Sequence, residues 1–99
     1  MGKTEDKFTA MLRAVGDPVR RKILKLLAEE GQCSIERPVG MCGADVEARV
    51  GLSQPTVSHH MAVLTKAGLV TAQRSGHWMW YRRNEKGLKE LRRLMREEL

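Results

Sequence analysis

The chain has 99 residues and a formal net charge of +6, from 18 Lys and Arg against 12 Asp and Glu. A chain this short buries a modest fraction of its unfolded surface, which favours one small domain completed by dimerisation over a monomer with a deep enzymatic cleft. The positive charge favours a polyanionic partner, and nucleic acid is the obvious one. No apolar run approaches the roughly 20 residues that span a bilayer, and no apolar segment follows the charged start MGKTEDKF. The sequence therefore predicts a cytoplasmic protein with no membrane partner.

Two helices are expected at the start of the chain. Apolar residues recur at helical spacing from Phe8 to Val15, which predicts an amphipathic helix over residues 5–15 that ends at Gly16. Asp17 is expected to cap a second helix, with Pro18 in its first turn, where proline has no N–H to lose. This helix is expected to run to about residue 30.

The next stretch contains both cysteines of the chain. Residues 31–43 hold three glycines and a proline, and this composition predicts a loop. A short helix is expected over residues 44–50, closed by Gly51 with a positive φ. Ser53 is expected to cap a further helix that runs to about residue 67.

The last third of the chain predicts a hairpin and a terminal helix. Residues 69–74 and 78–83 are prone to form strands, and Ser75-Gly76-His77 between them indicates the turn. The aromatic residues of the second strand are expected to cover the core and brace the hairpin. From Glu85 onward an apolar stripe lies opposite a basic face. A terminal helix has little core left to cover, so this stripe is expected to pack against a second subunit.

The segment centred on Gly51 to Gly68 has the pattern of a helix-turn-helix. Val57, Met61 and Leu64 recur at helical spacing and are expected to hold its second helix to the core, with the adjacent His60 partly packed. The polar side chains left outward are able to hydrogen-bond base edges and phosphates. They are Gln54, Thr56, Ser58 and His59. A solvated polar face would look similar, but the basic charge, the glycine corner and the following hairpin favour DNA binding.

The segments GDPVRRKILKLL, GLSQPTVSHHMAVLTKAGLV and RSGHWMWYR resemble the ArsR/SmtB family of winged helix-turn-helix repressors, in order and spacing. The resemblance implies a mainly α fold with a small β-hairpin, in one domain over residues 1–99. It implies a homodimer joined through residues 5–15 and 85–99, DNA reading by 44–67 and a wing over 69–83. The partner would be a double-stranded operator with an inverted repeat, released when an inducer binds.

Carried over to this chain, the DNA contacts of the family fall on the helix after Gly51 and on the wing. The principal ones are Gln54, Ser58 and His59. The neighbouring ones are Ser53, Thr56, Arg74, Ser75 and His77. Arg82 and Arg83 are also expected to flank the tip of the wing.

The inducer is expected near Cys33 and Cys42. Members of the family often carry Cys-x-Cys-Asp before the recognition helix, where thiolates bind arsenite, antimonite or soft divalent metals. Here Cys42 and Asp45 match and the second cysteine is missing. Loop glycines would allow Cys33 to approach Cys42, and As(III), Sb(III) or a soft divalent ion would then be held. Arsenite prefers three thiolates, so a third ligand would come from water or the partner subunit.

Other interpretations remain open at this point. Cys33 and Cys42 could instead form a redox-sensing disulfide, or Cys42 could pack in the core with Cys33 an incidental loop thiol. The terminal helix has no histidine or cysteine, which disfavours a zinc or nickel site there. No phosphate loop, metal-hydrolase pattern or nucleophile elbow indicates an enzyme. A protein-interaction module without sequence-specific DNA binding is the alternative of a different class, and a shallow salt dependence of binding would reveal it.

Overall fold

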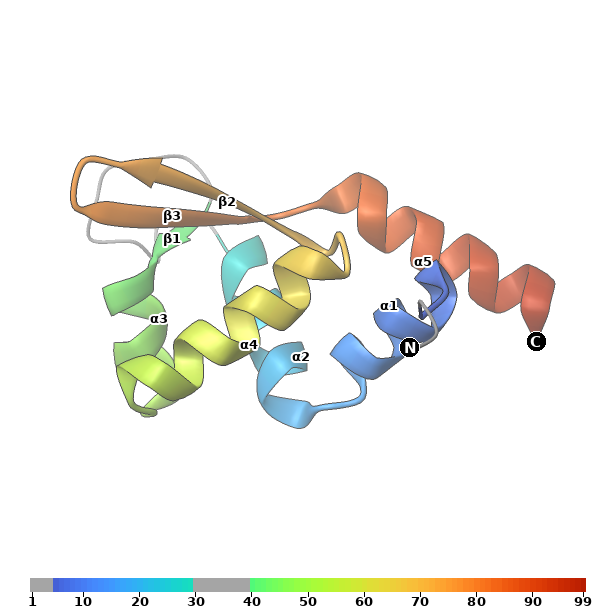
Figure 1. Ribbon diagram of the computed structural model, residues 1–99, viewed down its shortest axis with the longest axis horizontal. Coiled ribbons are helices and arrows are strands. Elements are labelled where there is room, and N and C mark those ends of the chain that lie inside the picture. The colour runs from blue at the N-terminus through green and yellow to red at the C-terminus, as the bar shows by residue number, and fades with distance from the viewer. Residues whose placement is uncertain (1–4, 30–39) are drawn as a thin grey trace.

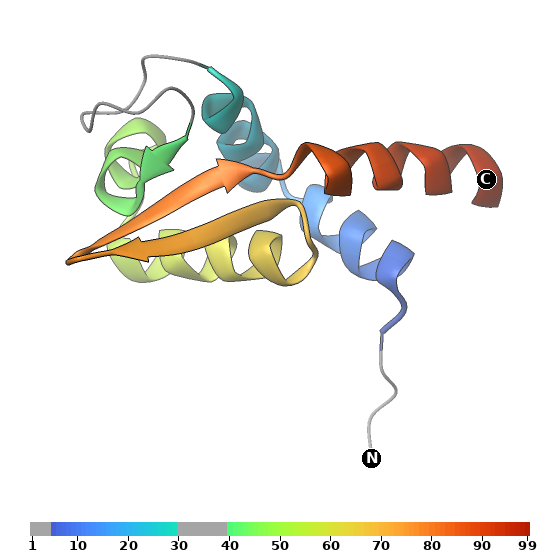
Figure 2. The same ribbon diagram turned by 90° about the horizontal axis from the view of Figure 1, so that it is seen from above.

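The computed structural model describes residues 5–29 and 40–99, except for the side chains of Ser75 and Trp78. The described elements are α1 (Lys7–Val15), α2 (Pro18–Ala28), β1 (Met41–Cys42), α3 (Gly43–Val50), α4 (Gln54–Lys66), β2 (Val70–Ser75), β3 (Trp78–Arg83) and α5 (Glu85–Glu98). The mainly α fold with a β-hairpin is confirmed. The hairpin tip and the end of α5 lie at opposite ends of the molecule (Figures 1 and 2).

The first two helices begin at carboxylate caps. Asp6 accepts a hydrogen bond from the backbone N–H of Thr9 at 2.8 Å, and Asp17 accepts one from the N–H of Val19 at 2.7 Å. Each carboxylate satisfies an N–H that the first turn of a helix leaves without a partner. The cap at Asp17 was predicted, whereas α1 begins two residues later than expected and α2 ends at Ala28.

The predicted loop over residues 31–43 is partly wrong. Residues 31–39 lie outside the described residues, but Met41 and Cys42 form strand β1, paired antiparallel with Tyr81 and Trp80 of β3. The backbone of this buried pair finds its hydrogen-bond partners in the sheet, which composition alone does not reveal. Gly40 enters the strand at φ 116°, and a Cβ there would lie 2.6 Å from the carbonyl oxygen of Tyr81.

One hydrophobic core joins the helices to the sheet. The side chains that are less than 2% exposed come from α1, α2, β1, α3, α4, the segment leading into β2 and the start of β2. The largest of them are Met11, Ile23, Leu27, Met41, Met61, Leu64 and Leu69. Every element that carries the predicted DNA-reading residues therefore rests on the same core.

The sheet has the order β1-β3-β2, and the β2–β3 hairpin runs in register from Val70↔Arg83 to Ser75↔Trp78. Ser75 belongs to the strand, so the turn consists of Gly76 and His77 alone rather than the three residues predicted. Gly76 takes φ 61°, which a two-residue hairpin turn requires and glycine supplies without strain. Trp80 is 2% exposed and Tyr81 packs half-buried on the core, as expected.

The apolar stripe of α5 is divided between two environments. Leu88 and Leu91 are buried in the core of their own subunit, which corrects the expectation that the whole stripe is left for a partner. Leu94 is half-buried, while Met95 is 41% and Leu99 85% exposed. Only the second half of the stripe therefore remains uncovered in one subunit.

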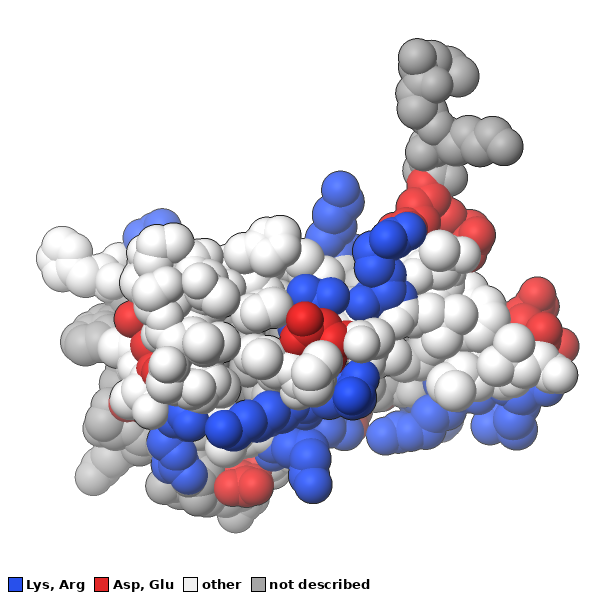
Figure 3. All heavy atoms as spheres, turned by 90° about the horizontal axis from the view of Figure 1, so that it is seen from below, with Lys and Arg blue, Asp and Glu red and all other residues white. Residues whose placement is uncertain are grey.

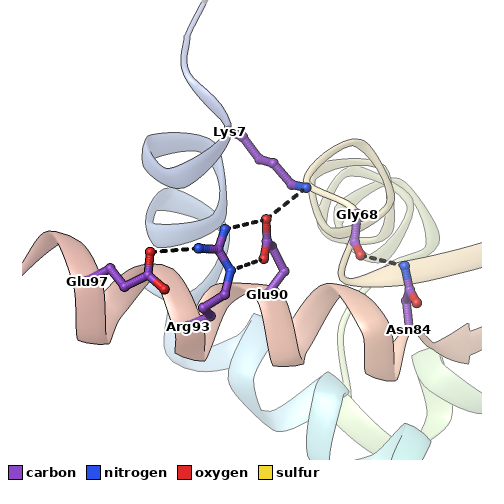
Figure 4. A network of polar contacts seen from close by, with 6 residues as sticks. All are labelled: Lys7, Gly68, Asn84, Glu90, Arg93 and Glu97. Atoms are coloured by element: carbon purple, nitrogen blue, oxygen red, sulfur yellow. Dashed lines mark hydrogen bonds and ion pairs between the residues drawn. The ribbon is translucent and has the colours of Figure 1, made fainter.

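A network of charged side chains on α5 reaches α1 through one ion pair (Figure 4). Arg93 donates to both oxygens of Glu90, at 2.7 and 3.0 Å, and to Glu97 at 2.7 Å, while Lys7 of α1 lies 3.5 Å from Glu90. The hydrogen bonds from Arg93 lower the pKa of Glu90 to about 2. The same figure shows Asn84, just before α5, donating to the carbonyl oxygen of Gly68 at 2.8 Å.

Candidate nucleic-acid interface

Helices α3 and α4 form a helix-turn-helix with Gly51 at the corner. Gly51 adopts φ 70° and ψ 30°, and its N–H donates to the carbonyl oxygen of Glu47 at 2.9 Å. This left-handed conformation closes α3, as predicted, and suits glycine because it has no Cβ. Val57, Met61 and Leu64 bury one side of α4, so its opposite side is fixed toward solvent.

The solvent side of α4 carries uncharged polar groups at its start. Gln54, Thr56, Ser58 and His59 are all exposed. The side-chain amide of Gln54 donates to the hydroxyl of Ser58 at 2.7 Å, which joins two of the predicted contacts one turn apart. This pair offers both donors and acceptors, the combination needed to hydrogen-bond base edges in a major groove.

Ser53 stands at the N-cap position of α4 but does not cap it through its side chain. Its hydroxyl lies 3.0 Å from the hydroxyl of Thr56, and it makes no side-chain hydrogen bond to the backbone of the first turn. The prediction that the side chain of Ser53 caps α4 is therefore wrong. The two hydroxyls pair because Thr56 is three residues on, where the side chains of a first turn meet.

The wing brings further predicted contacts to the surface. Arg74 and His77 are exposed near the tip, and Arg82 is exposed farther along β3. The side chain of Ser75 lies outside the described part of the structure. Arg83 does not flank the tip: it pairs with Glu85 at 2.8 Å and donates to the carbonyl oxygen of Leu24 at 3.3 Å. Arg83 thus fastens the base of the wing to α2 and α5.

A cleft of about 260 Å³ lies between α3, the start of α4 and the wing. Gln54, Ser58 and His77 line it, so the structure places predicted contacts from the recognition helix and the wing beside one another. Glu47 and Tyr81 line it as well, and no motif in the sequence pointed to either. Burial raises the pKa of the Tyr81 phenol, an effect that nearby Arg74 opposes and Glu47 reinforces.

Cys42 is fully buried at the junction of β1 and α3. Its thiol donates to the carboxylate of Asp45 at 3.3 Å, so the two residues matching the sensor motif are in contact. Cys33 lies outside the described residues. Over residues 5–29 and 40–99, no three His, Cys, Asp or Glu side chains gather closely enough to hold a metal ion.

Positive charge is distributed away from the reading helix. Residues 54–65 contain no Lys or Arg, and the first cation of α4 is Lys66 at its end. Seen from below, Lys and Arg gather mainly in a band along one edge of the molecule (Figure 3). In the part of the chain that the structure describes, no helix is long and apolar enough to cross a membrane.

A helix-turn-helix followed by a β-hairpin, with a polar reading face and a basic surround, defines a winged-helix DNA-binding protein. The model of the bacterial regulatory protein, arsR family, matches residues 17–72, and the chain belongs to this family. The resemblance drawn from the sequence is therefore confirmed. Members of the family are DNA-binding transcriptional regulators, not enzymes.

Three relatives place the chain within the family. An HTH-type transcriptional regulator of Methanocaldococcus jannaschii is 38% identical over 92 residues, covering 93% of this chain and 94% of that protein. A putative arsenical resistance operon repressor of Halobacterium salinarum is 36% identical, covering 76% of this chain and 57% of that protein. The crystal structure of a possible transcriptional regulator for arsenical resistance has a TM-score of 0.74 and 30% identity, covering 89% of this chain and 82% of that one.

Proposed function

We propose that this protein is a repressor that binds an inverted-repeat operator as a homodimer and leaves it when a thiophilic inducer binds near Cys33 and Cys42. The observation that carries the DNA-binding step is the exposed, hydrogen-bonded pair of Gln54 and Ser58 on a helix otherwise buried by Val57, Met61 and Leu64. Residues 44–67 read the DNA, and the wing over 69–83 contacts the neighbouring backbone through Arg74, Ser75 and His77. Ser53, Thr56 and His59 complete the contact surface.

Dimerisation uses residues 5–15 and 85–99. The support is the uncovered apolar surface at this end of the molecule, where Leu12 is 36%, Met95 41% and Leu99 85% exposed. Large apolar side chains on one end of a small protein favour a partner surface. A two-fold dimer would set two recognition helices in successive major grooves, roughly 34 to 36 Å apart.

Release of the operator begins at Cys42 in this proposal. Cys42 pairs with Trp80 in the sheet and also immediately precedes α3, the helix that feeds the recognition helix. A ligand that bonds its buried sulfur must displace the surrounding backbone, and the displacement reaches both the wing and α3. The arsenical-resistance descriptions of two relatives favour As(III) or Sb(III) over a soft divalent metal as the inducer.

A redox switch is the second candidate, favoured by the chain having two cysteines and no third thiol ligand. Oxidation of Cys33 and Cys42 to a disulfide would strain the same junction between β1 and α3. Both candidates act through the sulfur of Cys42. The reagent that releases the DNA, arsenite or peroxide, therefore distinguishes them.

The test begins with duplexes that the protein selects from a random-sequence pool. We expect enrichment of an inverted repeat with half-sites about 10 base pairs apart, centre to centre. Recovery of no preferred sequence, with a shallow dependence of binding on salt, would instead indicate the interaction module.

Fluorescence anisotropy of the selected duplex then identifies the inducer. Reduced protein is treated with arsenite or with peroxide, beside the Cys33→Ser and Cys42→Ser variants. Release by arsenite that both substitutions abolish supports metalloid sensing, and release by peroxide alone supports the disulfide switch. Indifference to both reagents would contradict a sensing role for the cysteines. Thermal unfolding of Cys42→Ser checks that this buried substitution leaves the fold intact.

A further inference from the structure

Arg20 of α2 joins three helices through its side chain. Its Nε donates to the carbonyl oxygen of Ala14 at 2.7 Å, and its Nη2 donates to that of Arg13 at 3.1 Å. Its Nη1 lies 3.0 Å from Nδ1 of His60 on the recognition helix. One guanidinium thus ties the carboxyl end of α1 to the middle of α4, with Arg20 and His60 lying 40 residues apart in the sequence.

The same three helices carry different tasks in the proposed function. The carbonyl groups of Arg13 and Ala14 end the helix assigned to dimerisation. His60 immediately follows His59, an assigned DNA contact, and is itself only 9% exposed. The orientation of α4 about its own axis decides where Gln54, Ser58 and His59 point.

The bond to His60 constrains the protonation of its ring. A guanidinium offers only donors, so Nδ1 must accept the hydrogen bond and the ring must be neutral, with its proton on Nε2. Asp17, which caps α2, interacts electrostatically with both His60 and Arg20. Burial raises the pKa of Asp17, but hydrogen bonds from the N–H groups of Arg20 and Val19 hold it below its ordinary value. Asp17 therefore stays anionic beside Arg20 and His60.

We propose that Arg20 is a positioning residue for DNA reading: by bonding neutral His60 it fixes the recognition helix against the dimerisation helix α1. This inference rests on the proposed function, because it assumes that α4 reads the operator. Loss of the guanidinium or of its acceptor opens this link, and α4 then loses its fixed orientation against α1.

A change in sequence preference distinguishes this role from a charge effect. Loss of a surface cation weakens the attraction to the phosphates of any duplex alike. Opening of the Arg20–His60 link instead weakens the preference for the selected sequence. The ratio of the two dissociation constants, for the scrambled and the selected duplex, separates the two effects.

The experiment uses the full chain and a duplex selected by the wild-type protein from a random pool. Arg20→Met is compared with Arg21→Met, which removes the same charge and also frees a carbonyl of α1, since Arg21 donates to Val15 at 2.6 Å. We expect Arg20→Met to lower the ratio about tenfold, the effect of losing one hydrogen bond to a charged group. Arg21→Met should weaken both duplexes alike and leave the ratio unchanged.

A second variant tests the bond from the side of His60. His60→Asn places an amide oxygen near the position of Nδ1, where it accepts from Arg20, so its ratio should stay close to that of the wild type. Sedimentation and thermal unfolding are run on each variant, so that loss of dimer or fold is recognised separately.

Three outcomes overturn parts of the account differently. Equal ratios for Arg20→Met and Arg21→Met would overturn the positioning role while leaving the proposed function intact. A ratio for His60→Asn as low as that for Arg20→Met would overturn the role of residue 60 as the acceptor. Failure of the wild-type protein to select any duplex would overturn the proposed function, and this inference with it.

Discussion

Helices α4 and α5 use their exposed faces in opposite ways. Over residues 54–65, α4 presents amides, hydroxyls and an imidazole, with no Lys or Arg. Helix α5 has the same kind of buried stripe, but its exposed side is mainly cationic. A hollow on this side is lined by Lys86, Lys89, Arg92, Arg93 and Arg96, together with Glu90. Figures 1 and 2 show α5 projecting away from the end of the molecule where the wing tip lies.

This contrast indicates a division of labour along one short chain. Short uncharged side chains discriminate between base edges because their donors and acceptors have fixed positions, whereas a cation attracts any phosphate. In the proposed function, cations placed off the reading face do not mask the choice of sequence by non-specific attraction. The apolar residues at the α1 and α5 end are then proposed to serve assembly.

The largest expected effect comes from the close contact between α5 and the turn that follows α4. At Gly87 of α5 a Cβ would overlap the carbonyl oxygen of Gly68, just after α4. Since both groups belong to the backbone, Gly87→Ala must push the helices apart and should destabilise the protein by about 3 kcal/mol. Urea denaturation measures this. Gly43→Ala serves as the control, because a Cβ there would meet only Tyr81 at 3.6 Å. Equal stability of the two variants would contradict a close backbone contact between Gly87 and Gly68.

The next effect concerns assembly. Met95→Glu combined with Leu99→Glu places charges on the uncovered apolar stripe and should raise the dimer dissociation constant about 100-fold, because a charge buried against apolar surface costs several kcal/mol. Lys86→Glu combined with Arg96→Glu, on the basic face of the same helix, should leave it unchanged. Analytical ultracentrifugation checks both. If the dimer tolerates Met95→Glu with Leu99→Glu, the interface must lie elsewhere on the protein.

A smaller effect separates the wing from α5 in DNA binding. Arg74→Gln with Arg82→Gln should flatten the dependence of log affinity on log salt by about 0.9 for each phosphate that the protein no longer neutralises, without changing the preferred sequence. Lys89→Gln with Arg92→Gln removes the same charge from α5 and should leave the slope almost unaltered. An equal flattening by both pairs would mean that DNA also reaches α5.

The smallest effect is an acid-dependent loss of stability at α5. Glu90 has a folded-state pKa of about 2, below its ordinary 4.5, because Arg93 hydrogen-bonds the carboxylate. Its contribution is therefore fully present above pH 4.5 and is lost as the pH falls from 4.5 toward 2. The contribution is modest because the contact is partly exposed to solvent. Urea midpoints measured across this range should fall less steeply for Glu90→Gln than for the wild type.

Local signals in the sequence predicted much of the fold. Asp17 and Pro18 began a helix, Gly51 closed one, and the period of Val57, Met61 and Leu64 separated the buried and exposed sides of α4. Each of these signals acts within a few residues of chain. Local pattern therefore located the helix-turn-helix before any tertiary contact was known.

Features made by distant residues were missed. Strand β1 has only two residues, and it forms because β3, some 40 positions later, supplies its partners. The placement of Glu47 and Tyr81 in the cleft and the contact of Arg20 with His60 likewise depend on packing between elements. Hydrophobic periodicity carries no information about such pairs, so the sequence indicated the reading face without indicating what holds it in place.

The most direct test of the central claim is the sequence preference of a variant that lacks the paired amide and hydroxyl of α4. Gln54→Ala combined with Ser58→Ala is compared with the wild type by anisotropy, on the selected duplex and a scrambled one. We predict that affinity for the selected duplex falls about 30-fold, roughly 2 kcal/mol of lost base discrimination, while affinity for the scrambled duplex, the dimer and the fold are unchanged. Normal binding of the selected duplex by this variant would contradict the assignment of α4 as the reading helix through these residues.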